Sequence, residues 1–345
     1  MSEKNQFDAQ VIRAGAGAVS ENAEFVPQSV VAPIVLSVVV PLFNEELVIH
    51  EMHRRLTRAL RNCVDSYEVV LVNDGSCDRT VELATEICRR DPTVRLINLS
   101  RNFGHQIAIT AGMDRCRGQC VVIIDADLQD PPEVIPQMLE KWKQGCHVVY
   151  GVRAHRKGDT WFKKTTAKIF YRLLRRVTAV PIPVDTGDFR LIDRRVLQEL
   201  GKMREQARFV RGMVSWVGFE QGEVVFERDQ RFAGETKYPF RKMLKFAIDG
   251  VLSFSYVPLK IASAFGFLCA AVSFAFMLYG LIQKSFYPET VVPGWASTFS
   301  AILFVGGVQL ICLGILGEYI GRIYEEVKKR PLYVIESEMK FECGQ

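Results

Sequence analysis

The sequence lacks the signatures of several large protein classes. Residues 1–32 contain no unbroken apolar stretch after a basic start, so no secretory signal peptide is visible, and we expect this segment to be a mobile tail. No Gly-x-Gly-x-x-Gly follows the first β-like segment and no Walker-type Gly-Lys-Ser or Gly-Lys-Thr occurs, which argues against dinucleotide-dependent dehydrogenases and P-loop ATPases. Nine cysteines are present, but the only close pair, Cys116 and Cys120, has no second pair at zinc-ligand spacing. We therefore interpret the cysteines as reduced thiols.

The chain also lacks a strong excess of charge of one sign. Its 44 basic and 39 acidic residues give a net charge of +5, with a pI near 8.7. This balance suits the binding of phosphates or of an anionic membrane surface, and we do not expect a nucleic acid partner. With 345 residues, of which 48% are hydrophobic, the chain is long enough for one large globular domain and an additional segment.

The first half of the chain alternates short β-branched runs with amphipathic stretches. Strands are predicted at 36–40, 68–72, 94–99, 121–124 and 148–150, and helices at 46–60, 79–90 and 132–144. This alternation predicts an α/β domain with a mostly parallel sheet, which we place at 33–240. The predicted strands are apolar throughout, as is typical of a sheet buried on both faces.

Polar residues follow four of the predicted strands. The carboxyl ends of parallel strands share one edge of the sheet, where ligands bind, so we expect these side chains to converge. They are Asn-Glu-Glu at 44–46, Asn-Asp-Gly-Ser at 73–76, Arg-Asn at 101–102 and Asp-Ala-Asp at 125–127.

The second half of the chain contains two long apolar stretches, at 259–282 and 296–320. Each has about 24 residues and almost no charge, enough to cross a hydrocarbon core of roughly 30 Å. Lys and Arg are concentrated before the first stretch and after the second, whereas the loop between them holds only Lys284. We therefore predict two transmembrane helices within 258–322 and cytoplasmic termini, with 323–345 as a cytoplasmic tail. Helices in a soluble core are the alternative, but they are rarely so long and so apolar.

Two further membrane features are expected. The segment 241–257 alternates cations with large apolar side chains, which suits an amphipathic helix in the headgroup plane or, alternatively, a helix packed on the globular domain. Gly307, Gly314 and Gly321 recur every seven residues in the second span. This stripe of small residues suits either homo-oligomerisation or packing against the first span.

An Asp-x-Asp motif follows one apolar predicted strand. Asp125 ends the strand, Asp127 lies just beyond it, and Gln129 follows two residues later. Carboxylate and amide oxygens suit a hard divalent cation such as Mg²⁺ or Mn²⁺, and such an ion can stabilise a departing diphosphate. Two acids at this spacing also occur by chance in surface loops, but the position after an apolar strand favours a metal site.

Two other acids at the same edge are candidates for binding a nucleoside. Asp74 and Glu45 could accept hydrogen bonds from a base edge or a ribose hydroxyl. The alternative for Asp74 is a cap of the predicted helix 79–90, a role that Ser76 or Asp78 could also fill. The alternative for Glu45 is a cap of the predicted helix 46–60.

Five motifs, in this order, resemble those of the family 2 glycosyltransferases. They are Val40-Pro41-x-Phe43-Asn44-Glu45-Glu46, Asn73-Asp74-Gly75-Ser76, Asp125-Ala126-Asp127-Leu128-Gln129, Thr186-Gly187-Asp188-Phe189-Arg190 and Arg231-x-x-Gly234-x-Thr236-Lys237-Tyr238. Within that family the chain is most similar to the polyprenyl-phosphate sugar synthases, which include dolichol-phosphate mannose synthases and bacterial enzymes that glucosylate undecaprenyl phosphate. The similarity covers about 35–330, and the two spans resemble the bacterial group best.

The resemblance implies a GT-A fold, inversion at the anomeric carbon and a nucleotide-sugar donor. The donor is expected to be UDP-glucose, as in the bacterial group, with GDP-mannose as the alternative. By this resemblance Asp125, Asp127 and Gln129 surround the metal and the diphosphate, and Asp127 is catalytic. The residues that it places on the nucleotide sugar are Pro41, Phe43, Glu45, Val72, Asp74, Asp125, Ala126, Asp127, Gln129, Arg153, Arg231 and Lys237. Family members often have Tyr in place of Phe43, so stacking on the base is retained without a hydroxyl contact.

The resemblance also implies a polyprenyl phosphate acceptor, which suits a membrane anchor. A lipid phosphate is already an anionic nucleophile, so it needs positioning and charge neutralisation more than proton removal. Lys163, Lys164 and Arg172 are candidate cations for this phosphate, or else solvated charges. Asp188 stands where related inverting transferases place a general base, and with a phosphate acceptor it could instead orient the acceptor or the sugar.

Three other protein classes fit less well. A membrane polysaccharide synthase usually has more spans and a Gln-x-x-Arg-Trp motif, which is absent. A phosphatase of the haloacid dehalogenase type has Thr or Val where Gln129 stands. An inactive membrane scaffold would have lost some of its acids, yet all four candidate aspartates remain. We therefore predict a glycosyltransferase of a bacterial plasma membrane.

Overall fold

The computed structural model describes residues 34–154, 186–227, 257–286 and 294–340. The chain divides into the units Met1–Pro33 and Ile34–Gln345, and every described residue belongs to the second. The predicted tail at 1–32 and nearly all of the predicted interfacial helix at 241–257 lie outside the described residues.

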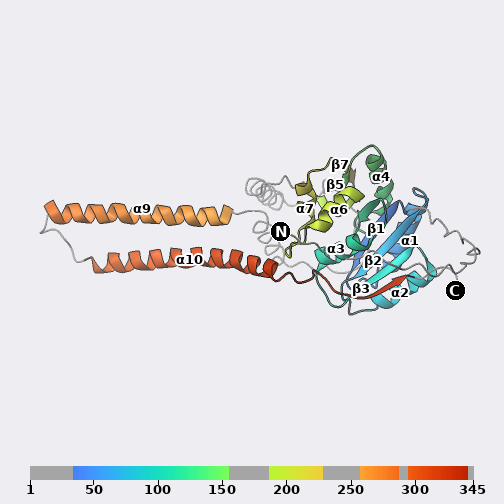
Figure 1. The fold of residues 1–345 in the computed structure, drawn as a ribbon, viewed down its shortest axis with the longest axis horizontal. Helices are drawn as coiled ribbons and strands as arrows, with labels where there is room; N and C mark the ends of the chain where they lie inside the picture. The colour runs from blue at the N-terminus through green and yellow to red at the C-terminus, as the bar shows by residue number, and fades with distance from the viewer. Residues whose placement is uncertain (1–33, 155–185, 228–256, 287–293, 341–345) are drawn as a thin grey trace, which may run out of the picture. The chain divides into compact units, whose positions relative to one another are not determined.

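An eight-stranded sheet forms the centre of the globular part (Figure 1). Its strand order is β7-β5-β6-β4-β1-β2-β3-β8. The four central strands β4, β1, β2 and β3 are parallel, and β7 is parallel to β5, whereas β6 and β8 run antiparallel to their neighbours. The bounds are β1 Leu36–Leu42, β2 Tyr67–Asn73, β3 Val94–Leu99, β4 Cys120–Ile123, β5 Val148–Arg153, β6 Thr186–Asp193, β7 Gln221–Phe226 and β8 Ile335–Lys340. The predicted α/β fold with a mostly parallel sheet is confirmed.

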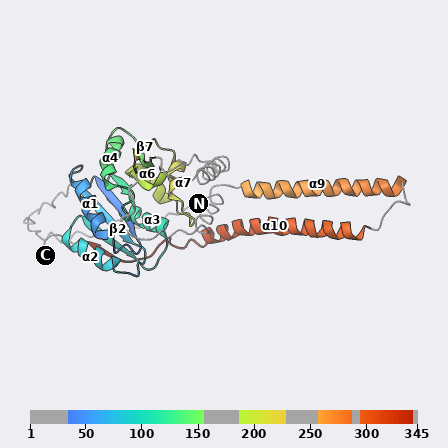
Figure 2. The same cartoon turned by 180° about the vertical axis from the view of Figure 1, so that it is seen from behind.

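Helices cover both faces of this sheet and create two separate cores (Figure 2). One core contains side chains of α1 Ile49–Arg61, α2 Thr80–Arg90 and α4 Ile135–Lys143, which follows a 3₁₀ turn at Pro132–Val134. The other contains side chains of α3 His105–Arg115, α6 Arg194–Lys202 and α7 Val210–Val217. In β1, Val38 and Val40 point into the first core and Val39 into the second. Successive side chains of a strand face opposite ways, so burial on both sides requires strands that are apolar throughout.

The five predicted strands and three predicted helices all form, with ends that differ by a few residues. The sequence reasoning missed β6, β7, β8, α3, α6 and α7. In α3 the buried positions run consecutively from Ala108 to Met113, so no amphipathic period marks the helix. Gly112 lets this helix approach the sheet closely, because a Cβ there would collide with Val39.

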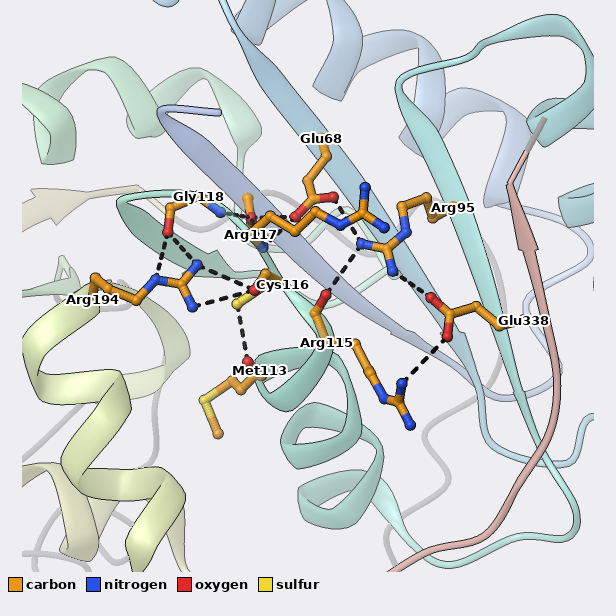
Figure 3. A network of polar contacts seen from close by, with 10 residues as sticks. Glu68, Arg95, Met113, Arg115, Cys116, Arg117, Gly118, Arg194 and Glu338 are labelled. Atoms are coloured by element: carbon orange, nitrogen blue, oxygen red, sulfur yellow. Dashed lines mark hydrogen bonds and ion pairs between the residues drawn. The ribbon is translucent and has the colours of Figure 1, made fainter. Parts of the chain in front are cut away.

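Strand β8 returns the C-terminal part of the chain to the sheet. The segment 323–345 was expected to be a tail, but Ile335–Lys340 pair antiparallel with β3. The buried guanidinium of Arg95 links the two strands (Figure 3): its Nη1 donates to Glu68 Oε2 at 2.9 Å and to the Arg115 carbonyl at 3.1 Å, and its Nη2 donates to Glu338 Oε1. In β8, partly buried and exposed residues alternate and charged side chains are frequent, so the segment is recognisable as a strand only once the edge of the sheet that it pairs with is known.

Two long helices, α9 Val257–Phe286 and α10 Trp295–Val327, cover both predicted spans. Within α10, Phe304–Val327 has a mean hydropathy of 1.6 and is not buried, so it is long and apolar enough to cross a membrane. The apolar stretch of α9 at Ala262–Phe276 is shorter, and the prediction of two membrane spans remains a proposal.

The glycine stripe of α10 makes no close contact with the residues that the structure describes. A Cβ added at Gly307, Gly314 or Gly321 would meet no atom within 4 Å. Helices α9 and α10 do contact each other, with Cys312 Sγ of α10 lying 3.7 Å from the Ala262 carbonyl of α9, so packing against the first span and homo-oligomerisation both stay predictions for this stripe.

Candidate active site

The Asp-x-Asp motif lies just beyond β4, at the carboxyl end of the parallel strands. Burial alternates from here onward: Asp125, Asp127 and Gln129 are partly exposed, whereas Ala126 and Leu128 are buried. Leu128 adopts a left-handed backbone conformation with φ of 57°, and Asp127 Oδ1 accepts a hydrogen bond from the Gln129 N–H at 3.1 Å. The three predicted metal ligands thus share the open side of one short turn.

The environment of Asp125 suits a cation. Its Oδ1 is buried and accepts no hydrogen bond from the part of the chain that the structure describes, although His105 Nε2 lies 3.4 Å away. Burial, reinforced by the carboxylates around it and opposed by His105, raises the pKa of Asp125 to about 6. No cluster of three or more His, Cys, Asp or Glu side chains that could hold a metal occurs among the described residues. Two carboxylates and an amide therefore fit an ion that takes its remaining ligands from phosphate oxygens and water.

Asp188 of β6 is buried beside this motif and accepts several hydrogen bonds. Arg211 of α7 approaches it with two nitrogens, Nε at 2.9 Å from Oδ1 and Nη2 at 3.2 Å from Oδ2. Gln106 Nε2 lies 3.1 Å and His105 Nε2 3.3 Å from the same Oδ2. Burial alone would raise the pKa of Asp188, but these donors and the cationic groups hold it well below its usual range. Asp188 is therefore a fixed anion with little affinity for a proton.

His105 connects the two acidic groups. Its Nε2 lies within 3.4 Å of both Asp125 and Asp188. Burial opposes protonation, but the hydrogen bond to Asp188 and the two carboxylate charges together raise the pKa of His105 to about 9. In this arrangement an imidazolium separates two carboxylates that would otherwise repel each other.

Two arginines, Arg190 and Arg153, lie next to the acidic residues of the site. Arg190 is almost fully buried, donates from Nη2 to the Gly187 carbonyl at 2.8 Å, and lies 4.0 Å from Asp188. Burial lowers the pKa of Arg190 to about 10. Arg153 pairs with buried Asp130 at 3.4 Å, and its guanidinium lies over Gly187, where a Cβ would come within 2.6 Å of Nη2. The pair with Asp130 places Arg153 next to the residue that follows Gln129, and its contact with the nucleotide sugar stays a prediction.

The predicted nucleoside residues lie at the ends of β1 and β2. Phe43 is 39% exposed, so its ring is available for stacking. Pro41 and Val72 are buried and paired across the two strands, and the Val72 side chain packs in the second core. Glu45 is partly exposed and donates its N–H to Thr80 Oγ1 at 2.8 Å.

Asp74 has a structural role that the sequence reasoning did not foresee. Its two oxygens accept hydrogen bonds from the N–H groups of Phe103 at 2.7 Å and Gly104 at 2.9 Å, just before α3. Asp78, not Asp74, accepts from the Thr80 N–H at the start of α2. Burial raises the pKa of Asp74, and the two N–H groups partly offset this. Asp74 therefore fixes the loop that precedes His105 in addition to any contact with a ligand.

Five of the predicted site residues cannot be placed. Arg231 and Lys237, predicted to bind the donor phosphates, lie outside the described residues. The same holds for the candidate acceptor cations Lys163, Lys164 and Arg172.

Sequence reasoning missed three residues that contact Asp188, namely His105, Gln106 and Arg211. His105 and Gln106 follow shortly after the polar Arg101-Asn102 pair at the edge of the sheet. Their position at this edge could have identified them as candidate site residues. Arg211 is the only charged residue in a mostly apolar helix, which marks it for a buried partner.

Comparisons with known proteins show the family of this chain. Residues 37–201 match the model of the family described as glycosyl transferase family 2, and residues 257–323 match the GtrB C-terminal hairpin. The chain is 54% identical over 300 residues to the uncharacterized glycosyltransferase YkcC of Bacillus subtilis, covering 87% of this chain and 93% of that protein. It is 39% identical over 301 residues to the SfII prophage-derived bactoprenol glucosyl transferase of Shigella flexneri, covering 87% and 97%.

A solved structure shows a weaker likeness. The glucosyl-3-phosphoglycerate synthase of Mycobacterium tuberculosis, in complex with Mn²⁺, UDP and phosphoglyceric acid, aligns with a TM-score of 0.44 at 18% identity. The alignment covers 64% of this chain and 76% of that chain.

Proposed function

Because this chain belongs to glycosyl transferase family 2 and is a glycosyltransferase, we propose that it transfers a hexose from a nucleotide sugar to polyprenyl phosphate at a membrane surface. The observation that carries the proposal is the pair of Asp125 and Asp127 at the carboxyl ends of the parallel strands, next to the fixed carboxylate of Asp188. The likeness to a bactoprenol glucosyl transferase supports a polyprenyl phosphate acceptor, with glucose from UDP-glucose as the specific donor we propose and GDP-mannose as the alternative.

Asp125, Asp127 and Gln129 would hold a divalent cation, Mg²⁺ or Mn²⁺. Such an ion, when bound, supplies positive charge against the leaving diphosphate. The protein's own contribution is to present two carboxylates on one rigid turn, because the left-handed Leu128 and the hydrogen bond from Gln129 to Asp127 fix its shape.

Asp188 would act by position in an inverting transfer. A carboxylate whose pKa is held well below its usual range is a poor proton acceptor at neutral pH. A lipid phosphate is already charged and needs no base. We therefore assign to Asp188 the orientation of the sugar or acceptor, with Arg211 and Gln106 keeping it in place.

The membrane helices would keep the lipid acceptor near the site. We propose that α9 and α10 both span the bilayer with cytoplasmic termini, since cations flank the apolar stretches on the side of the globular domain. The glycine stripe on α10, where an added Cβ would meet no atom of the described residues within 4 Å, supports a homo-oligomer as part of this proposal.

The reaction is tested with membranes that contain the full chain. We expect transfer of labelled sugar from a nucleotide donor to polyprenyl phosphate, and inhibition by EDTA that added Mg²⁺ or Mn²⁺ reverses. Asp127→Ala should lower the rate by about 10²-fold or more, the size of effect seen when a preorganised electrostatic contact is removed. A panel of UDP- and GDP-sugars identifies the donor.

Two results would contradict the proposal. Full activity of Asp127→Ala at limiting metal would remove the metal role, and absence of transfer from every donor in the panel would remove the acceptor assignment. Glu133→Gln is a matched control, because Glu133 is an exposed acid a few residues along the chain that pairs with Arg55.

A further inference from the structure

A cavity of about 640 Å³ lies where the end of α10 meets the loop between α6 and α7. Three cations, Arg204, Lys329 and Arg330, line it together with an apolar wall of Pro331, Leu332 and Tyr333. The cavity is separate from the candidate active site, since none of its lining residues belongs to that site. It therefore presents positive charge beside an apolar surface.

Specific contacts hold the walls of this cavity together. The main-chain N–H of Gln206 donates to Glu326 Oε1 at 2.6 Å, and its side-chain Nε2 donates to the Arg330 carbonyl at 2.7 Å. At the helix end, Lys329 adopts φ of 48°, which turns the chain away from the axis of α10. The cavity is thus formed by contacts between two segments that are distant along the chain.

Arg204 has an ion pair in the cavity wall, whereas Lys329 and Arg330 have none among the described residues. Arg204 Nη1 donates to Asp114 Oδ2 at 2.7 Å, and that oxygen also accepts from the Tyr333 hydroxyl. Lys329 and Arg330 are exposed, and their side chains make no hydrogen bond or ion pair with any residue that the structure describes. The only carboxylate in the lining is Glu326, which already accepts the Gln206 N–H. The hydrogen bond from Lys328, and after it the charges of Lys328 and Arg330, lower the pKa of Glu325, so Arg330 lies near one carboxylate outside the lining. The lining itself, with three cations and one carboxylate, keeps an excess of positive charge for an anion.

The cavity also lies at the end of the candidate membrane span. The candidate span Phe304–Val327 ends two residues before Lys329, and its last ten residues carry the charges of Glu318, Arg322, Glu325 and Glu326. Basic pockets at this level are suited to anionic headgroups.

We infer that this cavity binds the phosphate of a membrane lipid, with Lys329 and Arg330 pairing with the phosphate and the apolar wall packing against the adjoining chain. The inference rests on the proposed membrane span of α10. An anionic phospholipid and a polyprenyl phosphate both carry this chemistry, and they are distinguished by experiment.

The test uses the full chain in a neutral detergent, titrated with phosphatidylglycerol, polyprenyl phosphate or phosphatidylcholine while thermal unfolding is followed. We expect phosphatidylglycerol or polyprenyl phosphate, but not phosphatidylcholine, to stabilise the chain. The double variant Lys329→Gln with Arg330→Gln should weaken that binding on the order of 25-fold, from about 1 kcal/mol per cation near the lipid surface. The charge-conserving double variant Lys329→Arg with Arg330→Lys should keep it.

The matched control removes two cations elsewhere. Arg58 and Arg61 on α1 are both exposed, so Arg58→Gln with Arg61→Gln changes the net charge equally and should leave binding unaltered. Stabilisation by phosphatidylglycerol alone identifies a structural lipid, and stabilisation by polyprenyl phosphate alone identifies the acceptor. Equal binding by wild type and the cavity variant, or equal stabilisation by phosphatidylcholine, overturns the inference.

The result of the lipid-binding test does not depend on the proposed sugar transfer. Binding is measured without a sugar donor, so a chain that binds the lipid phosphate but transfers no sugar contradicts only the proposed function. A chain that transfers sugar normally but binds lipid equally well without its two cations contradicts only the inference about the cavity.

Discussion

The ion pair between Arg95 and Glu68 allows a quantitative prediction about how the C-terminal strand is held. Both side chains are 4% exposed, and Arg95 also reaches Glu338 on β8 (Figure 3). Replacing Arg95 with Met keeps most of the volume but leaves the charge of Glu68 buried without its cation. Removal of one partner of a buried pair costs about 3–5 kcal/mol. Glu68 keeps the Arg117 N–H and the Ser37 hydroxyl as donors, so we expect the lower end, about 3 kcal/mol.

Two companion variants separate the causes. Glu338 is 31% exposed, so Glu338→Gln removes a partly solvated contact and should cost about 0.5 kcal/mol. In the double variant Glu68→Gln with Arg95→Met, no unpaired charge remains, and we expect a loss of only about 1 kcal/mol.

Urea unfolding of the full chain in detergent, followed by circular dichroism, measures these differences. With a slope of about 1–3 kcal/mol per M, a loss of about 3 kcal/mol lowers the midpoint by about 1–3 M. The reasoning is refuted if Arg95→Met shifts the midpoint no more than Glu338→Gln. It is also refuted if the double variant is as unstable as Arg95→Met, because the buried charge would then not be the cause.

Two other predictions concern the candidate active site. Gly187→Ala should push the Arg153 guanidinium aside and raise the KM for the donor by about tenfold, the worth of one charge-assisted hydrogen bond. In the control Gly201→Ala the new Cβ meets nothing within 4 Å, so steady-state kinetics should stay unchanged. Equal kinetics of the two variants would contradict this prediction. Asp188→Asn should lower kcat without altering the pH profile. The pKa of Asp188 in the folded chain is held well below the value of about 4 that an aspartate has in an unfolded chain, so the carboxylate is ionised at every pH above about 4 and is protonated only in stronger acid. An acidic limb near neutral pH that disappears in Asp188→Asn would instead identify this residue as a base.

Several features of the site could be predicted from the sequence because their signals are local. A buried parallel strand needs a continuous apolar run, and the acid that ends such a run lies at the ligand-binding edge, so Asp125 and Asp127 could be placed from the sequence around them. Arg153, at the end of β5, was placed by its match to an arginine of the family. The two long apolar helices also follow from length and apolar composition alone.

Contacts between distant segments could not be predicted in this way. Asp188 is fixed by Gln106 and Arg211, which lie 82 and 23 residues away along the chain, and no local pattern encodes such pairs. The same reason applies to Asp74, whose partners are main-chain N–H groups that almost any residue could supply.

The sequence by itself determined the α/β series, the acidic edge and the apolar helices, because period, composition and chain order are properties of neighbouring residues. Only the tertiary structure decided that the chain returns after α10 to add β8 to the sheet, and that Arg211 and Gln106 donate to Asp188 and hold its pKa low. Both depend on which groups burial brings together, since a pKa and a strand edge are set by their surroundings in space.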